Sequence, residues 1–197
     1  EANCAVFIQC VGSRIPERQY CSRLCCTHSL ESALKLKEIN PKMNVYILYR
    51  DIRSYGFRED IYIKARERGV IFIRYDLDHL PAVSSEDGRT IAVRVRDHVL
   101  DRDIRISPQI VILASAILPN DNKELYELFK LPVNAEGFLV EAHMKLRPVD
   151  FASDGIFMAG LAHYPKPLDE TIAQAKAAAK LMNRLGVDTI LVCSNVG

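Results

Sequence analysis

Short apolar runs that alternate with helix-like segments limit most strongly how this chain can fold. Three runs have the length and composition of buried strands: residues 5–9, 45–49 and 70–73. Between them, residues 27–40 and 57–68 mix apolar and charged side chains at helical spacing, and the second stretch ends at Gly69. Strand, helix, strand, helix, strand is the order of a right-handed parallel unit, so we expect a parallel sheet with helices packed on it.

The middle of the chain changes to a pattern of period two. Residues 90–95 alternate apolar and polar side chains, and Asp87-Gly88 just before them is a hairpin signal. We therefore predict a small antiparallel meander over residues 82–106. Residues 110–114 have the pattern of one more buried strand, which we expect to return to the parallel sheet.

These elements, with a short helix over 122–131, define the first predicted domain. We expect residues 1–133 to form an α/β, Rossmann-like, three-layer domain with a β-meander. This order of elements matches the dinucleotide-binding domains of flavoproteins that bind two dinucleotides. Residues 134–197 form the second predicted domain, with strand-like runs at 137–140 and 155–160 and an alanine-rich helix over 169–185.

The overall composition excludes several classes of protein. Of the 197 residues 49% are hydrophobic and 26% charged, which suits a folded domain rather than a disordered chain. The formal net charge of +1 disfavours nucleic-acid binding. With no apolar run near the roughly 20 residues of a membrane span and no signal peptide, we expect a cytoplasmic protein. Since the chain opens with Glu1 and reaches a strand almost at once, we expect a piece of a longer polypeptide.

The cysteines are placed very unevenly. Of six, four fall between residues 10 and 26, and the remaining two are Cys4 and the distant Cys193. Disulfides serve small exported proteins with little core, whereas this chain has a normal hydrophobic content. Metal or redox chemistry is therefore the leading explanation for the group of four.

Several unusual strings resemble the A-type subunit of heterodisulfide reductase. They are the stretches 10–14 (CVGSR), 20–26 (YCSRLCC), 49–59 (YRDIRSYGFRE), 141–152 (EAHMKLRPVDFA) and 160–167 (GLAHYPKP). The resemblance covers nearly the whole chain. A Gly-rich FAD-binding loop and ferredoxin-like cluster motifs, both usual in that family, are missing here, which supports the expectation of a fragment.

The resemblance implies an iron-sulfur flavoprotein with a thioredoxin-reductase-like FAD/NAD(P)-binding fold. In methanogens the family supports flavin-based electron bifurcation and reduction of the heterodisulfide of coenzyme M and coenzyme B. The implied cofactors are a [4Fe-4S] cluster and FAD, the latter with only part of its site in this chain. The implied partners are other heterodisulfide reductase-type subunits and hydrogenase- or ferredoxin-like electron-transfer proteins, and a second copy of the chain in a homodimer is an open alternative.

By this resemblance, Cys10, Cys21, Cys25 and Cys26 are the cluster ligands. Irregular loop spacing can supply four thiolates as well as a ferredoxin pattern does. Arg14, Arg18 and Arg23 lie nearby and are expected to favour the thiolate forms. A zinc or dithiol site and ordinary buried thiols remain the alternatives, although the adjacent pair of cysteines fits zinc poorly.

The cysteine segment stands where a nicotinamide-binding domain has its Gly-rich phosphate loop, yet G-x-G-x-x-G is absent. We infer that a cluster replaces NAD binding in this half; a plain Rossmann loop is the alternative. Arg50, Arg53 and Arg58 follow the second strand, where NADPH-binding relatives place basic residues against the 2'-phosphate. Without the glycines, a structural or partner-docking role is favoured.

Residues 154–160 are similar to the strand and turn by which such reductases contact FAD, except that Leu161 stands where relatives have Asp. The helix after it is expected to point its N-terminal amides at the flavin. The cofactor-binding residues implied here are Gly160, Leu161, His163, Lys166, Thr171, Ile172 and Gln174. Two interpretations of His163 and Lys166 remain open. Either they tune the potential of the flavin, or His163 is a hydrogen-bonded loop histidine and Lys166 a surface lysine.

Alternate residues of a segment expected to be extended form a further candidate face. They are Glu141, His143, Lys145 and Arg147, and they suit a partner interface or a flavin-side wall. The leading hypothesis is thus an oxidoreductase subunit, with no catalytic residue of its own assigned, that is inactive when isolated. A non-catalytic docking scaffold with a zinc- or dithiol-stabilised loop is the alternative, and a free-standing NADPH reductase is disfavoured.

Overall fold

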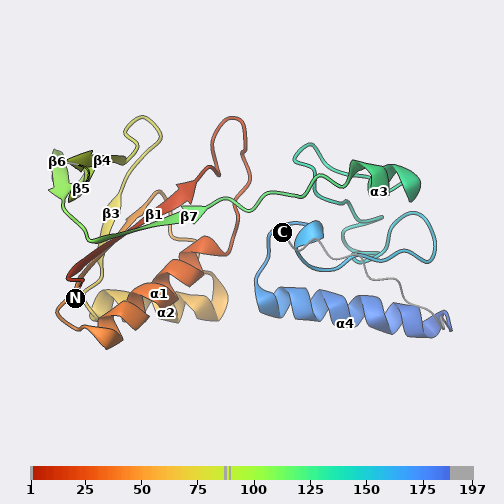
Figure 1. Cartoon of the computed structure of the whole chain (residues 1–197). Helices are drawn as coiled ribbons and strands as arrows, with labels where there is room; N and C mark the ends of the chain where they lie inside the picture. Colours follow the sequence, from red (N-terminus) through yellow and green to blue (C-terminus); the bar gives the residue numbers. More distant parts are fainter. Residues whose placement is uncertain (1, 87, 89, 187–197) are drawn as a thin grey trace. The chain divides into compact units, whose positions relative to one another are not determined.

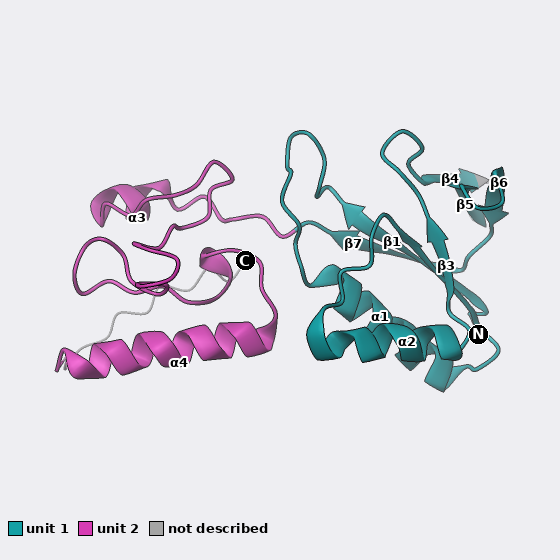
Figure 2. Ribbon diagram, turned by 180° about the vertical axis from the view of Figure 1, so that it is seen from behind, with its two compact units in different colours: residues 1–116 teal, residues 117–197 magenta. Residues whose placement is uncertain are grey.

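A computed structural model of the chain describes residues 2–86, 88 and 90–186 (Figure 1). The chain divides into two compact units, residues 1–116 and 117–197 (Figure 2). The sequence placed this division at 133. Residues 117–133 instead fall in the second unit, where Tyr126 and Leu131 pack against its buried core.

A four-stranded parallel sheet forms the centre of the first unit. Its strands are β1 (Cys4–Val11), β2 (Asn44–Tyr49), β3 (Ile71–Arg74) and β7 (Ile110–Ser115). Their order across the sheet is β3-β2-β1-β7, and all three neighbouring pairs run parallel. The predicted parallel unit and the return of the last strand to its edge are therefore confirmed.

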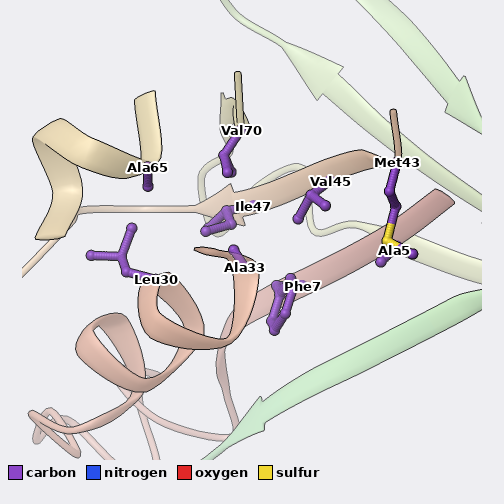
Figure 3. Packing of buried hydrophobic residues seen from close by; sticks show 9 residues of the cluster. All are labelled: Ala5, Phe7, Leu30, Ala33, Met43, Val45, Ile47, Ala65 and Val70. Atoms are coloured by element: carbon purple, nitrogen blue, oxygen red, sulfur yellow. The ribbon is translucent and has the colours of Figure 1, made fainter. Parts of the chain in front are cut away.

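Helices cover one face of this sheet. They are α1 (Cys25–Ile39) and α2 (Glu59–Glu67), the latter preceded by the short 3-10 helix η1 (Gly56–Arg58). Leu30 and Ala33 of α1 and Ala65 of α2 pack against Phe7 and Ile47 of the strands, as Figure 3 shows. Burial of this apolar face holds the helices on the sheet.

An antiparallel meander packs on the other face. It consists of β4 (Ala82–Glu86), β5 (Thr90–Asp97) and β6 (Arg102–Ile106). Val93 and Ile106 share a core with Val6, Ile8 and Leu48. Successive β1 residues thus point to opposite layers, which makes β1 buried on both faces. At the predicted Asp87-Gly88 turn, Gly88 has φ +65°, and residues 87 and 89 lie outside the described residues.

The second unit has helices α3 (Lys123–Leu128) and α4 (Leu168–Arg184) and the 3-10 helix η2 (Gly160–Ala162). The prediction of strands at 137–140 and 155–160 is wrong. Among the described residues each run makes only a single bridge, Val133 to Leu139 and Asp150 to Phe157. A strand needs one neighbouring strand along its length, whereas the backbone bonds of residues 137–140 go to scattered loop positions at 132, 134 and 162.

Two smaller features complete the described chain. Helix α3 ends at Leu128 rather than 131 because Lys130 adopts a left-handed conformation with φ +53°. None of the helices in the described part of the chain is long and apolar enough to cross a membrane.

Candidate cofactor sites

The four clustered cysteines belong to the loop that follows β1 at the carboxyl edge of the parallel sheet. From β1 the chain crosses to β2 on one side, while β7 returns on the other. Ligands of open parallel sheets bind at such a switch point, outside the carboxyl ends of the strands. The fold therefore presents this loop where a dinucleotide phosphate would otherwise lie.

The backbone of this loop is coiled tightly by residues in left-handed conformations. Cys10, Arg14 and Arg23 have φ of 59°, 57° and 59°, and Gly12 has 73°. Such conformations cost side-chain-bearing residues free energy and gather at functional sites. At Gly12 an added Cβ would lie 3.3 Å from the Arg18 guanidinium, which itself donates to the Gly12 carbonyl. The positive φ at this position favours glycine, and any side chain would also require Arg18 to shift by a few tenths of an ångström.

Helix α1 begins at Cys25, two residues before the predicted start at Thr27. Cys25 and Cys26 therefore lie in its first turn, where the positive end of the helix dipole favours a negatively charged group. The backbone N–H of Arg23 also donates to the Cys21 sulfur at 3.3 Å. Donors of this kind stabilise thiolates bound to a metal or cluster.

Residues just after β2 hold the cysteine loop in place. The buried Arg50 guanidinium donates to the Arg14 carbonyl at 2.6 Å and to the Ser13 carbonyl at 2.7 Å. Asp51 forms a 2.5 Å ion pair with Arg14, and its carbonyl accepts a bond from the Cys26 thiol at 3.7 Å. Arg50 thus has a structural role, which the missing glycine loop had already favoured over binding of a 2'-phosphate.

The other arginines named from the sequence are also engaged within the unit. Arg58 stacks over the Tyr55 ring, with 5.2 Å between its guanidinium carbon and the centroid, and Arg53 lies 4.0 Å from Asp51. Arg23 donates to the Tyr55 hydroxyl at 2.6 Å. The Arg14 guanidinium contacts a cysteine side chain directly, with Nη1 at 3.9 Å from the Cys10 sulfur.

The cysteine thiols influence one another's ionisation. Burial, followed by the neighbouring Cys26, Cys21 and Cys10, raises the pKa of Cys25 to about 11. Burial likewise raises the pKa of Cys26, against an opposing effect of Arg14. The arginines were expected to favour thiolates, but at these two residues desolvation outweighs them. The Cys25 and Cys26 thiols therefore stay protonated until a cation replaces their protons.

The four thiols lie near one another in this loop. All four are free, and Cys26, Cys21 and Cys10 are each close enough to Cys25 to raise its pKa. A structural zinc ion and a [4Fe-4S] cluster are both held by four thiolates. The loop therefore supplies a complete set of sulfur ligands for a metal centre.

The predicted flavin-facing residues of the second unit form a buried hydrogen-bond network. His163 Nε2 lies 2.8 Å from a Glu141 oxygen, while Lys166 Nζ and Gln174 Nε2 donate to His163 Nδ1 at 3.1 and 2.8 Å. Gln174 Oε1 accepts from Lys166 at 2.5 Å and from the Gly160 N–H at 2.9 Å. With two donors at Nδ1, the ring proton resides on Nε2 and is donated to Glu141.

Burial makes this network unusual. Lys166 is only 4% exposed and His163 only 9%. The surface-lysine interpretation of Lys166 is therefore wrong. Burial and the Lys166 charge lower the pKa of His163, despite the opposing effect of Glu141. The unit thus keeps a neutral imidazole beside a buried amine, two groups able to act on a polar ligand.

The remaining predicted residues lie around this network. Gly160, at φ +81°, is close enough to α4 that an added Cβ would lie 3.5 Å from Thr171 Cγ2. Leu161 and Ile172 are 40% and 44% exposed apolar side chains. Helix α4 begins at Leu168, so Thr171 lies in its first turn. That turn also carries Asp169 and Glu170, which partly offset the positive helix end that was expected to face a flavin.

The segment around His143 is not extended, contrary to the sequence expectation. His143 and Arg147 form an antiparallel bridge, and the His143 Nδ1 accepts from the N–H groups of Lys145 and Leu146 at 3.2 and 3.3 Å. This closes a tight turn, so alternate residues do not share one face. Glu141 alone of the four joins the buried network.

Two residues of the sites were missed from the sequence. Asp51 anchors Arg14 beside the cysteines, and its only signal was its place after a buried strand. Gln9, directly before Cys10, is fully buried, and neither of its amide atoms has a hydrogen-bond partner among the described residues. A buried amide left unpaired is costly, which makes Gln9 a candidate contact for a group bound in the cysteine loop.

Comparison with known proteins relates the whole arrangement to one family. No family model matches the chain. The iron-sulfur A-type subunit of the CoB–CoM heterodisulfide reductase of Methanocaldococcus jannaschii is 42% identical over 185 residues, which are 90% of this chain and 28% of that protein. The A-type subunit of the ferredoxin:CoB–CoM heterodisulfide reductase of Methanosarcina acetivorans is 38% identical over 196 residues, 96% of this chain and 24% of the relative. The chain is homologous to one part of the A-type subunit of heterodisulfide reductase.

A further relative carries a related name. The protein from Archaeoglobus profundus, named as similar to the A-type subunit of heterodisulfide reductase, is 37% identical over 178 residues, 88% of this chain and 25% of the relative. The chain spans about a quarter of the length of these curated relatives. The resemblance seen in the cysteine and histidine strings is thereby confirmed.

Solved structures confirm the thioredoxin-reductase-like fold. The HOCl-induced flavoprotein disulfide reductase RclA from Escherichia coli matches with a TM-score of 0.59 and 14% identity, over 93% of this chain and 36% of that one. The thioredoxin reductase of Lactococcus lactis matches with a TM-score of 0.56 and 14% identity, over 94% and 54%. At such identities the likeness shows the fold alone.

Proposed function

We propose that this chain is an electron-transfer segment of a heterodisulfide reductase-type oxidoreductase, in which Cys10, Cys21, Cys25 and Cys26 hold a [4Fe-4S] cluster. One observation carries the proposal: four free thiols lie near one another at the switch point of the sheet, and the adjacent Cys25 and Cys26 fit the ligand spacing of zinc poorly. The names of the relatives, one of which is an iron-sulfur subunit, support it.

The surrounding residues suit a group with negative charge. When bound, a [4Fe-4S] cluster accepts and donates one electron at a time. Arg14 adds positive charge beside Cys10, and the Arg23 N–H donates to the Cys21 sulfur. The first turn of α1 offers a positive helix end to Cys25 and Cys26. These features favour negative charge in the loop and oppose the burial that raises the pKa of Cys25 and Cys26.

In the second unit we place part of an FAD site. Its residues are Gly160, Leu161, His163, Lys166, Thr171, Ile172 and Gln174. The exposed Leu161 and Ile172 offer apolar surface for a flat ring, and the buried Lys166 supplies a positive charge in the same unit. A flavin exchanges one or two electrons, which suits exchange with a cluster. We assign the first unit to the NAD(P)-type domain and the second to the C-terminal part of the FAD domain.

Binding of FAD tests this second site. Lys166→Met is expected to weaken binding of FAD to the chain by on the order of tenfold, because the buried charge is lost. Lys176→Met is the matched control, since Lys176 lies on the exposed side of α4. Equal affinity of the two variants, measured by quenching of flavin fluorescence, contradicts a role of Lys166 in the site.

On the scale of the whole enzyme, we propose that electrons pass between FAD and iron-sulfur centres toward other subunits. The partners are other heterodisulfide reductase-type subunits and hydrogenase- or ferredoxin-like proteins, in keeping with relatives named ferredoxin:CoB–CoM heterodisulfide reductase and H2/formate:CoB–CoM heterodisulfide,ferredoxin reductase. Because it holds only part of a flavin site, the chain is not expected to catalyse a complete redox reaction by itself.

Metal and sulfide analysis tests the cluster. After anaerobic reconstitution the chain is expected to hold iron and acid-labile sulfide in a ratio near one to one, about four of each per chain, with broad visible absorption. Cys21→Ser and Cys26→Ser are expected to lose most of both. Cys4→Ser, at the opposite end of β1, is the matched control and retains them.

The same preparation distinguishes the docking-scaffold alternative. A chain that keeps zinc in air, shows no visible absorption and takes up no iron after reconstitution would establish a zinc-stabilised loop instead. Unchanged iron content in both Cys21→Ser and Cys26→Ser would remove these cysteines from the ligand set. The sixth cysteine, Cys193, lies outside the described residues.

A further inference from the structure

A second group of metal-ligand side chains lies in the first unit, and its residues are distinct from the cysteines. Asp76 follows β3, His79 lies three residues further on, and His98 follows β5. One ligand atom from each lies within 4.8 Å of the other two. No other such group of histidine, cysteine, aspartate or glutamate occurs in the described residues.

The geometry directs both imidazoles at one carboxylate. His79 Nδ1 lies 3.1 Å from Asp76 Oδ1, and His98 Nε2 lies 3.0 Å from Asp76 Oδ2. The two rings are 5.9 Å apart between centroids and nearly perpendicular, at 69°. Nitrogen and oxygen ligands of tetrahedral zinc are about 3.4 Å apart, so the separations here, all within 4.8 Å, can be brought to that value by small side-chain rotations.

Buried residues anchor the backbone segments that carry Asp76 and His98. Tyr75, directly before Asp76, is 3% exposed, and its N–H donates to the Tyr49 carbonyl at 2.9 Å. Val95 of β5 shares the same buried cluster. The His79 N–H also donates to Asp76 Oδ1 at 2.8 Å, which orients the carboxylate. Ligands on such anchored segments lose little freedom when they bind an ion.

We propose that Asp76, His79 and His98 bind a divalent transition-metal ion of the zinc class. Two imidazoles and one carboxylate are a common three-ligand set for such ions, with a further position for water. His79 and His98 are exposed, so an ion can enter from solvent. Because the ligands come from the ends of β3 and β5, the ion ties the parallel sheet to the meander.

Residue-specific protection tests the site without interference from the cysteines. The untagged full chain is treated with diethyl pyrocarbonate, with and without Zn²⁺, and each histidine is followed by peptide mass mapping. Zn²⁺ is expected to slow modification of His79 and His98 by on the order of tenfold, because coordinated nitrogens do not react. His143, which lies outside this group and away in sequence from the cysteine loop, reports any general effect of the metal.

Variants and a spectroscopic probe complete the experiment. Asp76→Asn is expected to abolish the protection, whereas Asp78→Asn, an exposed neighbour outside the group, keeps it. Co²⁺ bound here gives ligand-field bands without the sulfur-to-cobalt charge-transfer band of a thiolate site. Equal modification with and without Zn²⁺, or cobalt spectra that show only thiolate ligands, would overturn the proposal. Asp76→Asn that stays protected would do the same.

Discussion

His163 shows how a single buried side chain is defined by its partners. Its Nε2 donates to Glu141, while Lys166 and Gln174 both donate to its Nδ1. A proton on Nδ1 would make it a donor that faces two other donors, one of which is the buried amine of Lys166. The neutral ring is therefore required by the packing, and this is why burial and Lys166 lower the pKa of His163.

The network predicts that the second unit loses stability on mild acidification. The pKa of His163 is lowered from its ordinary 6.5, so below pH 6.5 the unfolded chain binds a proton that the folded chain refuses. The contribution of His163 to the free energy of unfolding is fully present above pH 6.5. It falls as the pH drops toward the folded-state pKa, by about 1.4 kcal/mol for each unit of the pKa shift. Glu141, with its pKa also lowered, adds a loss below pH 4.5.

Melting temperatures at pH 8.0 and 5.5 measure this effect. The difference between the two is expected to shrink in His163→Gln, which cannot titrate, relative to the parent chain. His28→Gln, at an exposed position on α1, serves as the control and keeps the difference. A His163→Gln chain with the full parental pH dependence would assign the effect to other groups.

At the level of elements, the loop after β1 depends on the residues that follow β2. Arg50 donates to two successive carbonyls of that loop, and Asp51 pairs with Arg14 from it. The cysteine loop contains several residues in left-handed conformations, and its internal backbone hydrogen bonds are those of a few short turns. Contacts from other parts of the unit are therefore needed to hold its shape. The end of one strand thus shapes the loop after its neighbour.

Loss of this support is expected to disturb the cysteines more than the fold of the sheet. Arg50→Met removes two charge-assisted hydrogen bonds to buried carbonyls and is expected to cost about 3 kcal/mol in unfolding free energy. Arg50→Lys retains the charge but not the planar fork and is expected to recover only part of it. Arg53→Met, at a side chain 50% exposed, is the matched control.

Two measurements separate the local effect from general unfolding. Urea unfolding gives the stability, and iron retained after reconstitution gives the state of the cysteine loop. Arg50→Met that remains folded at low urea is expected to hold clearly less iron than Arg53→Met. Equal iron in both variants would show that the loop keeps its shape without Arg50.

Element positions followed well from local pattern, and their ends less so. The central strands were predicted within one or two residues, because apolar runs bounded by turn residues are a local signal. The start of α1 was not, since its N-cap Leu24 makes no side-chain capping bond. Packing of the cysteine loop, rather than a capping residue, sets that end.

Over the whole molecule, the chain has separate hydrophobic cores in its two units. Leu30 is fully buried between α1 and the sheet of the first unit. Phe151 is 1% exposed in the core of the second unit, with Leu139 and Met158. Units that each bury their own core are able to open independently.

Truncation of each core residue is therefore expected to act on one unit only. Leu30→Ala should cost about 2–5 kcal/mol and Phe151→Ala about 3–5 kcal/mol, each through a cavity in its own core. Hydrogen exchange followed by mass spectrometry is expected to accelerate in peptides of the first unit for the former and of the second unit for the latter. Ile39→Ala, 71% exposed on α1, is the control.

A shared response would change this view of the molecule. If Phe151→Ala accelerates exchange in β1 and β2 as much as in α4, the two units unfold as one cooperative body. The chain contains no tryptophan, so a single fluorescence signal cannot report on the units separately. Peptide-level exchange is the measurement that resolves them.

The sequence by itself determined the order of strands and helices, the parallel sheet with its meander, and the identity of the four cysteines as one group. It also singled out His163, Lys166 and Gln174. These features are local in the chain, because periodicity, turn residues and short motifs are set by neighbours a few residues apart.

Only the tertiary structure decided which distant groups meet. Asp51 reaches Arg14 across 37 residues, Glu141 reaches His163 across 22, and Asp76 faces His98 at the ends of two different strands. No spacing rule encodes such pairs, because loop length and the packing of layers determine them. The same packing buries Lys166 and raises the pKa of the Cys25 and Cys26 thiols, so the chemistry of each site depends on the folded chain.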